Sequence, residues 1–350
     1  MVLSEFLNEW LDGNSRLLVH TSGSTGDPKP MWVEKQRMLN SARMQCNFLG
    51  LRRGDTALLC MNLKYIGAKM VVVRAIERGL KLLAVSPSGH PLSAWAALRA
   101  QDVEVADFGI AHLSRRQTDI ASGCTYLGVR ICIAMVPMQV YNTLQVPDEA
   151  RWLRGIRQLI IGGGAIDSGL ETALQTCQHA VWSTYGMTET LSHIALRRLN
   201  GAEASEWYRP FEGVTVSLNS DDCLVIDAPM VHEGLLATHD RAVIRPGRGF
   251  KILGRKDNVI VSGGVKIQIE EVEKALAPHL HEPFVIARRP DVKFGEAVVL
   301  LTEAADCQAV MTVCRRVLPA YWVPKDVMHV DKIPMTETGK PKRNIVIGRG

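Results

Sequence analysis

The sequence lacks the features that mark several classes of protein. Its eight cysteines are scattered and never spaced as C-x-x-C, which argues against a zinc site or a disulfide framework and fits reduced thiols. No apolar run reaches the ~18 residues that a transmembrane helix needs, because Arg74 and Glu77 interrupt the most apolar stretch. The first ten residues, MVLSEFLNEW, have neither the basic nor the apolar region of a signal peptide. We therefore expect a cytoplasmic protein without a membrane span.

A large excess of charge is also missing. The chain carries 41 Lys and Arg against 36 Asp and Glu, a formal net charge of +5. That balance is far from the polybasic pattern of nucleic-acid-binding proteins, so nucleic acid is not an expected partner. Hydrophobic residues make up 47% of the sequence and charged residues 22%, which excludes wholesale disorder. At ~150 residues per domain, the length of 350 residues predicts about two domains.

Short apolar runs alternate with helical patterns, which predicts an α/β fold with helices on the faces of a sheet. Up to residue 199, we predict strands at 17–20, 56–61, 80–85, 130–136, 159–161 and 181–184, and helices at 38–49, 67–78, 91–100, 148–157, 168–178 and 189–199. Short strands then follow one another from 214 to 253, and further helices are predicted at 269–277 and 308–318. We therefore predict a large N-terminal α/β domain, 1–254, with a small β-rich subdomain, and a small mobile α+β domain, 255–350.

The strongest local motif, TSGSTGDPK at 21–29, directly follows the first predicted strand. Its two glycines let the backbone approach a phosphate, and its four hydroxyls and its lysine supply donors to the phosphate oxygens. It is not a Walker A loop, because Lys29 lies three residues after Gly26 and precedes Pro30. A plain surface turn has the same composition. On its own, the motif leaves both interpretations open.

Four further motifs follow in order: YGMTET at 185–190, THD at 238–240, GRKDNVIVSGGVKIQIEEVE at 254–273 and TGKPKR at 338–343. Together the five segments closely resemble the adenylate-forming superfamily of acyl-CoA synthetases, peptide-synthetase adenylation domains and luciferases. The resemblance runs from about residue 17 to the C-terminus, and it implies a shortened N-terminal lobe. Within the superfamily, LKYIGAKMVVVRAI (63–76) and GMTETLSHIALR (186–197) look most like the o-succinylbenzoate–CoA ligases of menaquinone synthesis.

The resemblance implies a two-step reaction. A carboxylate attacks the α-phosphate of ATP to give an acyl-adenylate and pyrophosphate, and the thiol of coenzyme A then attacks the acyl carbon and releases AMP. The implied partners are a small-molecule carboxylic acid, ATP and coenzyme A, with Mg²⁺ as the metal. The sequence leaves the oligomeric state open, and a homodimer is one of the alternatives.

The same resemblance implies roles around the nucleotide. Lys29 balances charge on the departing pyrophosphate, and Tyr185 stacks on adenine. Thr188 reaches the α-phosphate and Glu189 holds Mg²⁺, for which one carboxylate with phosphate oxygens and waters suffices. The pattern predicts that Thr188 caps a strand-to-helix turn, whose N-terminus would also attract phosphate. The implied nucleotide-binding residues are Thr21, Ser22, Gly23, Ser24, Thr25, Gly26, Lys29, Gly163, Gly164, Ala165, Tyr185, Gly186, Met187, Asp240 and Arg255.

The later motifs carry the ribose, hinge and thiol functions of the family. Asp240 matches an aspartate that accepts hydrogen bonds from both ribose hydroxyls, although its usual glycine neighbour is His239 here. Arg255 matches an arginine that touches the ribose, and Asp257 matches the hinge between domains. Gly263 and Gly264 resemble the loop that lines the pantetheine tunnel; two adjacent glycines also suit a plain hairpin turn. Lys340 matches the lysine that offsets charge on the α-phosphate during adenylation.

The acid pocket carries the weakest signal. In the stretch 62–67 and the helix after it, Lys64 or Lys69 would balance the second carboxylate of o-succinylbenzoate, and Tyr65 would supply an aromatic contact. His193 would lie near the acyl group. From the residues alone, a solvated Lys64 and a histidine on a helix face are equally good interpretations. The alternatives are a ligase for another small or aromatic acid, an enzyme that loads a separate carrier protein, and a non-catalytic nucleotide-binding protein.

Overall fold

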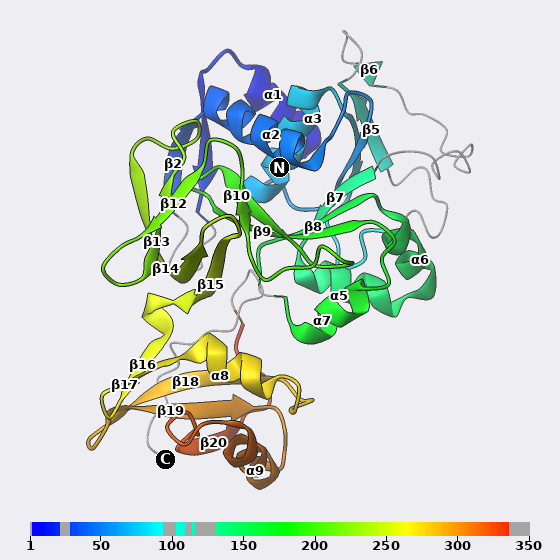
Figure 1. The fold of residues 1–350 in the computed structure, drawn as a ribbon. Helices are drawn as coiled ribbons and strands as arrows, with labels where there is room; N and C mark the ends of the chain where they lie inside the picture. Colours follow the sequence, from blue (N-terminus) through cyan, green and yellow to red (C-terminus); the bar gives the residue numbers. More distant parts are fainter. Residues whose placement is uncertain are drawn as a thin grey trace.

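A computed structural model describes residues 2–21, 29–93, 103–108, 114–115, 131–164 and 166–335 (Figure 1). Its largest sheet has nine strands among these residues, in the order β11-β10-β9-β8-β7-β3-β4-β5-β6. The strands are β3 (Thr56–Leu59), β4 (Lys81–Val85), β5 (Val103–Asp107), β6 (Ser114–Arg115), β7 (Ile131–Met135), β8 (Gln158–Ile161), β9 (Ala180–Met187), β10 (Ser192–Arg198) and β11 (Arg209–Pro210).

The five central strands, β9, β8, β7, β3 and β4, run parallel, and the outer strands on both sides are antiparallel. Parallel strands covered on both faces are buried along their length and mostly apolar, as β3 is: all four of its residues are buried, and only Thr56 is polar. Because these strands are parallel, their carboxyl ends meet at one edge of the sheet. Ligands of open α/β sheets bind outside such an edge.

Helices cover both faces of this sheet, and successive residues of a strand face opposite helices. Leu59 packs in the core with α2 and α3, whereas its neighbour Leu58 packs in a second core with α5, α6 and α7. Proline opens both α5 and α6, a position where its missing N–H costs nothing. The helices are α1 (Leu3–Leu11), α2 (Lys35–Leu49), α3 (Ile66–Arg78), α5 (Pro137–Gln145), α6 (Pro147–Gly155) and α7 (Ser168–Leu174).

An N-terminal hairpin, β1 (Arg16–His20) with β2 (Pro30–Glu34), lies beside α1 and α2. Lys35 ties these elements together, since its ammonium donates to the carbonyls of Glu9 and Trp10 at the end of α1, at 2.9 and 2.8 Å. The same ammonium also bonds to the Asp12 carboxylate at 2.8 Å and helps to hold the pKa of Asp12 down at about 2. A cation at a helix C-terminus satisfies carbonyls that the helix leaves open.

Two further sheets follow. The β-rich part has the order β12 (Thr215–Leu218), β13 (Cys223–Asp227), β14 (Leu235–Arg245) and β15 (Gly249–Arg255). A 3-10 helix, Lys256–Asn258, leads to the last sheet, which Figure 1 shows below the rest of the molecule. That sheet and its helices comprise β16 (Val259–Ser262), β17 (Val265–Gln268), α8 (Ile269–Leu276), β18 (Phe284–Asp291), β19 (Gly295–Thr302), α9 (Cys307–Val317) and β20 (Asp326–His329).

The mixed α/β fold predicted from the sequence is confirmed, with one clear error. The predicted helix at 189–199 is instead β10, which pairs antiparallel with β9. The prediction failed because Ile194, Ala195 and Leu196 are consecutive buried residues. Such a run lacks the alternation of a half-exposed strand and so looks helical. The helix predicted at 91–100 lies largely outside the described residues, and within those residues no helix is long and apolar enough to cross a membrane.

Candidate active site

The YGMTET motif forms the tip of the β9–β10 hairpin at the carboxyl edge of the sheet, so the predicted strand-to-helix turn is wrong. Leu191 and Ser192 adopt φ values of 55° and 95°, which side-chain-bearing residues rarely do. The hydroxyl of Ser41 on α2 donates to the Leu191 carbonyl at 3.0 Å, and the Thr190 hydroxyl donates to the Ser192 carbonyl at 2.8 Å. Backbone strain that neighbours hold in place is typical of functional sites.

This turn presents the two residues expected at the α-phosphate and the metal. Thr188 is buried and Glu189 is half-buried. No helix starts here, so the helix dipole expected to attract phosphate is absent from this turn. Among the described residues, no group of three or more His, Cys, Asp or Glu side chains could hold a metal ion. A single carboxylate such as Glu189 fits a Mg²⁺ whose other ligands are phosphate oxygens and waters.

Tyr185, near the end of β9, contacts the β-rich sheet through both its ring and its hydroxyl. The hydroxyl donates to Oδ2 of Asp240 at 2.7 Å. The ring meets Phe250 edge-on with 5.1 Å between centroids, and Tyr208 lies at 5.9 Å. Burial and the neighbouring Asp240 charge raise the pKa of Tyr185, so the phenol stays protonated and remains a donor. The contact brings together two residues predicted at adenine and ribose.

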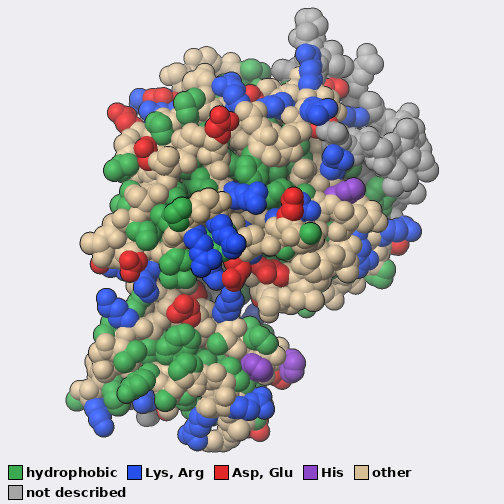
Figure 2. Space-filling view, in the orientation of Figure 1, with side chains coloured by type: hydrophobic (Ala, Val, Ile, Leu, Met, Phe, Trp, Pro, Cys, Tyr) green, Lys and Arg blue, Asp and Glu red, His purple; other side chains and the backbone are tan. Residues whose placement is uncertain are grey.

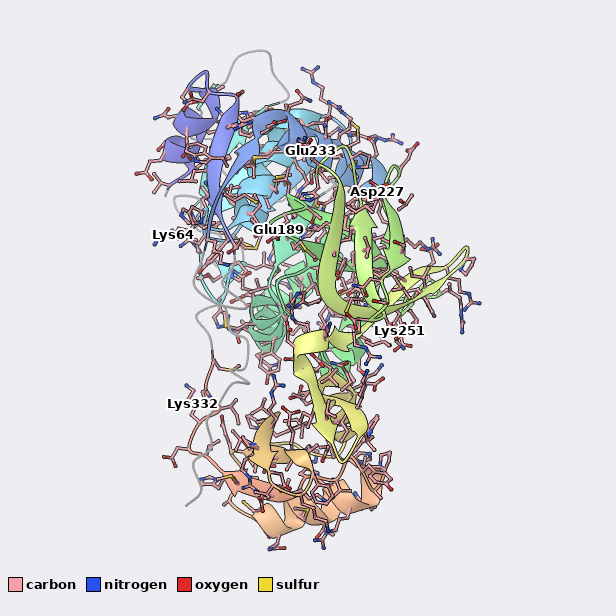
Figure 3. All side chains as sticks on the ribbon, turned by 90° about the vertical axis from the view of Figure 1, so that its left-hand side faces the viewer. Lys64, Glu189, Asp227, Glu233, Lys251 and Lys332 are labelled. Carbon is pink, nitrogen blue, oxygen red and sulfur yellow. The ribbon has the colours of Figure 1, made fainter. Side chains whose placement is uncertain are left out.

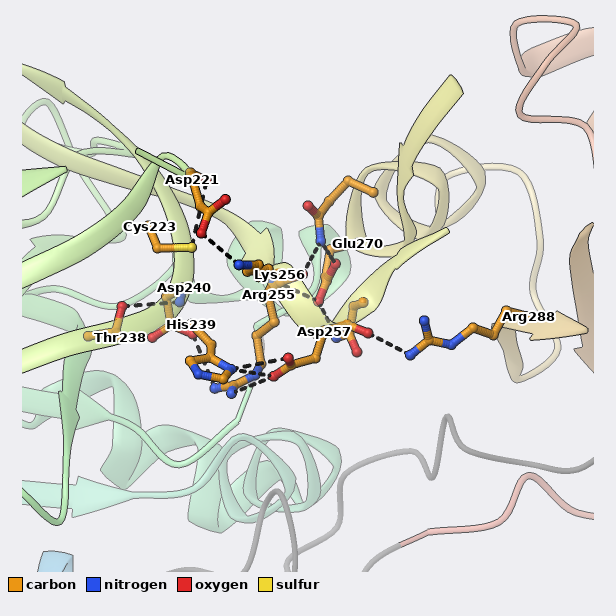
Figure 4. Close-up of polar contacts among 12 residues, drawn as sticks. Asp221, Cys223, Thr238, His239, Asp240, Arg255, Lys256, Asp257, Glu270 and Arg288 are labelled. Carbon is orange, nitrogen blue, oxygen red and sulfur yellow. Dashed lines mark hydrogen bonds and ion pairs between the residues drawn. The ribbon is translucent and has the colours of Figure 1, made fainter. Parts of the chain in front are cut away.

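Asp240 belongs to a chain of charges that leads to the expected hinge (Figure 4). One guanidinium nitrogen of Arg255 lies 3.3 Å from Oδ1 of Asp240, and another lies 3.1 Å from Oδ2 of Asp257. His239 completes the chain, because its Nδ1 is 3.0 Å from the same Asp257 oxygen. Although burial opposes the shift, hydrogen bonds from His239 and Arg255 lower the pKa of Asp257. The resemblance predicted Asp240 and Arg255 at the ribose and Asp257 at the hinge, and His239 only as a departure from the family.

The segment that joins β15 to the last sheet is closely enclosed. A Cβ on Gly254 would lie 2.5 Å from the side chains of both Gln268 and Glu270. Gln268 donates to the Arg255 carbonyl at 2.9 Å, and Lys256 pairs with Asp221 at 2.6 Å. Glu206 adds a bridge between the two parts, since it holds Lys251 of β15 and Lys274 of α8, each at 2.7 Å. Figure 2 shows basic and acidic side chains gathered on the face of the large part, above the last sheet.

The turn after β8 carries the expected glycines. A Cβ on Gly162 would lie 2.4 Å from the Thr184 hydroxyl and 3.5 Å from Nε2 of His193, so this position has room for a Cβ only if the Thr184 side chain moves. Gly163 has a φ of 82°, and a Cβ on Gly164 would touch Pro137 at the start of α5. Ala165 lies outside the described residues. The turn faces the same edge as the YGMTET hairpin.

The described residues include only the two ends of the TSGSTGDPK motif. Thr21 and Lys29 form the closed neck of the loop, since the Thr21 amide donates to the Lys29 carbonyl and the Lys29 amide donates to the Thr21 hydroxyl, both at 3.0 Å. This neck joins β1 to β2. The other predicted residues of the loop, Ser22, Gly23, Ser24, Thr25 and Gly26, lie outside the described residues, as does Lys340 near the C-terminus.

The residues predicted for the acid pocket have different surroundings. Lys64 is exposed before α3, and Tyr65, 43% exposed, is the N-cap of that helix. Figure 3 shows Lys64 and Glu189 from the side, at similar heights in the molecule. Lys69 is turned away from the edge, with its ammonium 5.5 Å from the Phe6 ring centroid and 3.8 Å from a Glu9 oxygen. Its surroundings therefore argue against a role for Lys69 on the acid.

Gly263 and Gly264, expected at the pantetheine tunnel, form the turn of the β16–β17 hairpin. Their φ values are 58° and 83°, the pattern of a two-residue turn that matches strand twist. The hairpin interpretation is thus correct, and it leaves a further role on a ligand open.

Gln45 and Arg74 are buried residues that belong to none of the five motifs. The available signal was Arg74 itself, a lone charge inside the run VVVRAI.

Comparison with known proteins agrees with this geometry. A family model described as AMP-binding enzyme matches residues 8–230. A curated relative from Bacillus thuringiensis subsp. konkukian, named 2-succinylbenzoate–CoA ligase, is 26% identical over 92% of this chain and 67% of its own, so the chain spans about two thirds of that relative. The solved structure of the O-succinylbenzoate coenzyme A synthetase of Bacillus subtilis, in complex with ATP and magnesium ion, matches 93% of this chain and 68% of its own at 19% identity and a TM-score of 0.68.

A shorter relative matches along nearly its whole length. It is the acyl-CoA synthetase (AMP-forming)/AMP-acid ligase II-like protein of Dyadobacter fermentans, 30% identical, with 97% of this chain and 91% of that chain covered and a TM-score of 0.60. The resemblance predicted from the five motifs is thereby confirmed at the level of the family. The chain belongs to the AMP-binding enzyme family and, within it, to the AMP-forming acyl-CoA synthetases and AMP–acid ligases.

Proposed function

We propose that the protein joins a small carboxylic acid to coenzyme A through an acyl-adenylate, with ATP as the energy source. One observation carries the proposal, the contact of Tyr185, Asp240 and Arg255 beside the carboxyl edge of the parallel strands. The Asp240 carboxylate accepts hydrogen bonds, as two ribose hydroxyls require, and the Tyr185 ring lies beside it. A phosphate chain extending from this ribose would reach the turn that carries Thr188 and Glu189.

The reacting groups would then be supported on several sides. Thr188 donates to the α-phosphate, and Glu189 supplies a carboxylate to Mg²⁺, which screens the phosphate charges when bound. Lys29, fixed at the neck of its loop, balances charge on the pyrophosphate. Lys340 offsets the charge that builds on the α-phosphate oxygens during attack by the acid. Removing one preorganised donor of this kind costs about 3–4 kcal/mol of transition-state stabilisation.

Thioester formation would follow a rotation of the part after residue 255 about Asp257. Hinge residues are typically few and lie at the ends of elements, as Asp257 does in the 3-10 helix. After the rotation, Gly263 and Gly264 would line the path of the pantetheine arm. The pairs Lys256–Asp221 and Lys274–Glu206 lie between the two parts here, and would have to separate.

For the acid itself we propose 2-succinylbenzoate, on the names of the curated relatives. Its second carboxylate needs a cation, and Lys64 is the exposed candidate next to Tyr65, whose ring would meet the aromatic part of the acid. His193 would lie near the acyl group, because its Nε2 faces Gly162. Lys69 is left out of this assignment, since its ammonium is directed at Glu9 and the Leu18 carbonyl.

The test is ATP–pyrophosphate exchange across a panel of aromatic, dicarboxylic and fatty acids, followed by thioester formation with coenzyme A. Exchange that requires 2-succinylbenzoate supports the full proposal, and exchange with another acid corrects the substrate alone. Exchange without transfer to coenzyme A would point to a carrier-protein thiol as acceptor. Absence of exchange with every acid would contradict the catalytic function and favour a nucleotide-binding protein without catalysis. Asp240→Asn tests the proposed ribose contact, and we expect it to raise the KM for ATP.

A further inference from the structure

A charged side chain lies in the core between α3 and the large sheet without a charged partner. Arg74 is only 4% exposed, and it makes no ion pair among the described residues. It borders a small cavity whose other lining residues are mostly apolar, among them Val71, Leu80 and Ile160. Burying a charge without a partner is costly, so a retained one calls for an explanation. Its single described hydrogen-bond partner is Gln45 of α2.

That hydrogen bond fixes the orientation of the Gln45 amide. Arg74 donates to Oε1 of Gln45 at 2.7 Å, and a guanidinium can only donate. The flipped amide would place its NH₂ group against Arg74, two donors facing each other. In the orientation that Arg74 enforces, Nε2 of Gln45 is buried and has no partner. The amide thus keeps its oxygen toward Arg74 and leaves its own NH₂ group without a partner.

The same oxygen then determines which ring nitrogen of His193, on β10, carries the proton. Nδ1 of His193 lies 3.1 Å from Oε1 of Gln45, and since that atom is an acceptor, Nδ1 must carry the proton. Burial and the charge of Arg74 lower the pKa of His193 to about 3, which keeps the ring neutral. The other described residues beside the ring are uncharged, namely Gly162 in the turn after β8, Thr184 and Gly186 of β9, and Gln45 of α2. A neutral ring protonated at Nδ1 has a lone pair at Nε2.

Nε2 of His193 points to the edge where the acid is proposed to bind. It would lie 3.5 Å from a Cβ on Gly162, in the turn at the end of β8, and no described residue donates a hydrogen bond to it. We propose that Arg74 and Gln45 are positioning residues that hold His193 in its Nδ1-protonated form, so that Nε2 accepts a hydrogen bond from a donor on the bound acid or its adenylate. This inference rests on the proposed ligase function, which places the acid at this edge.

The proposal restricts what His193 can recognise. An unprotonated nitrogen attracts a hydroxyl or N–H group and repels a carboxylate. A second carboxylate on the acid must therefore be met elsewhere, at a cation such as Lys64. A site built to bind a donor rejects an analogue that lacks it, because its own acceptor is then left unpaired. 2-Succinylbenzoate, with two carboxylates and a ketone, offers no such donor. The inference therefore favours a hydroxyl- or amino-bearing acid as the substrate, and it keeps only the ligase function from the proposal above.

The first test measures the tautomer in the resting protein by long-range ¹⁵N–¹H correlation, with side-chain ¹⁵N-histidine. His193 is assigned by the signals lost in His193→Gln, and the other nine histidines serve as internal references. We expect protonated Nδ1 and unprotonated Nε2 from pH 5.5 to 8. Protonated Nε2 in the wild type would overturn the proposal whether or not the enzyme turns over.

Two substitutions separate positioning from general structure. Arg74→Met removes the donor and should give a mixture of both tautomers. Its matched control is Arg78→Met one turn later on α3, since Arg78 also donates to an α2 side chain, Asn47, and that change should leave His193 as in the wild type. Gln45→Glu keeps the acceptor but adds a charge, which should raise the pKa of His193 and make it a cation. Unchanged His193 signals in both Arg74→Met and Gln45→Glu would refute the coupling.

The second test is kinetic. In Gln45→Glu, where the ring becomes a cation, the KM for the acid should rise about tenfold, the effect of one lost hydrogen bond. In Arg74→Met, where part of the protein keeps the accepting tautomer, the KM for the acid should rise by a smaller factor. The KM for ATP should stay as in the wild type in both variants. Arg74→Lys, which keeps a donor, should recover part of the loss. Equal changes in both KM values would indicate a general structural defect and contradict the proposal. If no acid supports exchange, the ligase function fails, while the tautomer result stands on its own.

Discussion

Replacing Gly186 by alanine tests how tightly the β9–β10 hairpin, which carries Thr188 and Glu189, is packed. A Cβ at this position would lie 1.9 Å from the Ser192 carbonyl oxygen and 2.7 Å from the Cα of His193, both backbone atoms. Real Cβ contacts are essentially never below 3.0 Å, so the two strands must separate by at least 3.0 − 1.9 = 1.1 Å. Side-chain rotation cannot relieve a clash with backbone. Forcing an extra methyl group into a packed region costs about 1–3 kcal/mol.

Because the shift acts next to Thr188 and Glu189, activity should fall further than stability does. A displacement of about 1 Å from reacting geometry costs roughly 10²-fold in rate. We therefore expect Gly186→Ala to lower the denaturation midpoint and to reduce acid-dependent ATP–pyrophosphate exchange by about that factor. The control is Gly155→Ala at the end of α6, where a Cβ meets nothing within 4 Å. If Gly186→Ala matched this control in both stability and exchange, the close packing of the hairpin would be refuted.

Three further predictions concern charged groups. Lys340→Ala should reduce adenylate formation about 10²–10³-fold but spare thioester formation from supplied acyl-adenylate, and equal loss of both half-reactions would contradict its role. Glu189→Gln should raise the Mg²⁺ concentration needed for half-maximal exchange, whereas an unchanged requirement would place the metal elsewhere. Hydrogen bonds from Lys251 and Lys274 lower the pKa of Glu206 from 4.5 to about 2, so its stabilising effect is full above pH 4.5 and disappears as the pH falls toward 2. The stability difference between the wild type and Glu206→Gln, followed by denaturation, should close over that window.

Much of the fold was predictable because its elements have local causes. The strand at 17–20 and the helix at 67–78 follow from apolar periodicity, and both are present within a residue. The helix predicted for 189–199 failed because burial on both faces of β10 removes alternation, which is a property of the finished sheet. Likewise, the first helix, α1, depends on tertiary support, since Lys35 from a distant segment holds its last carbonyls.

The candidate site shows the same division. Tyr185, Asp240 and Arg255 could be predicted because each lies in a short motif that is unbroken in the sequence. The structure brings the three residues into contact. Lys69 was selected on charge alone, and its direction on α3 could not be known without the position of Glu9. Gln45 carries no motif at all. Its role arises from its position between Arg74 and His193, which belong to α3 and β10.

The double engagement of Arg255 has a thermodynamic consequence. One guanidinium bonds to Asp240 and to Asp257 at the same time, so the residue proposed at the ribose and the residue proposed at the hinge share a single cation. A ligand that draws on Asp240 changes the strength with which Arg255 holds Asp257, and a change at Asp257 alters Asp240 by the same free energy. Such coupling is reciprocal by necessity. If Asp240 binds the ribose and Asp257 is the hinge, as proposed, nucleotide binding biases the orientation of the last sheet, and fixing that orientation changes the affinity for the nucleotide in return.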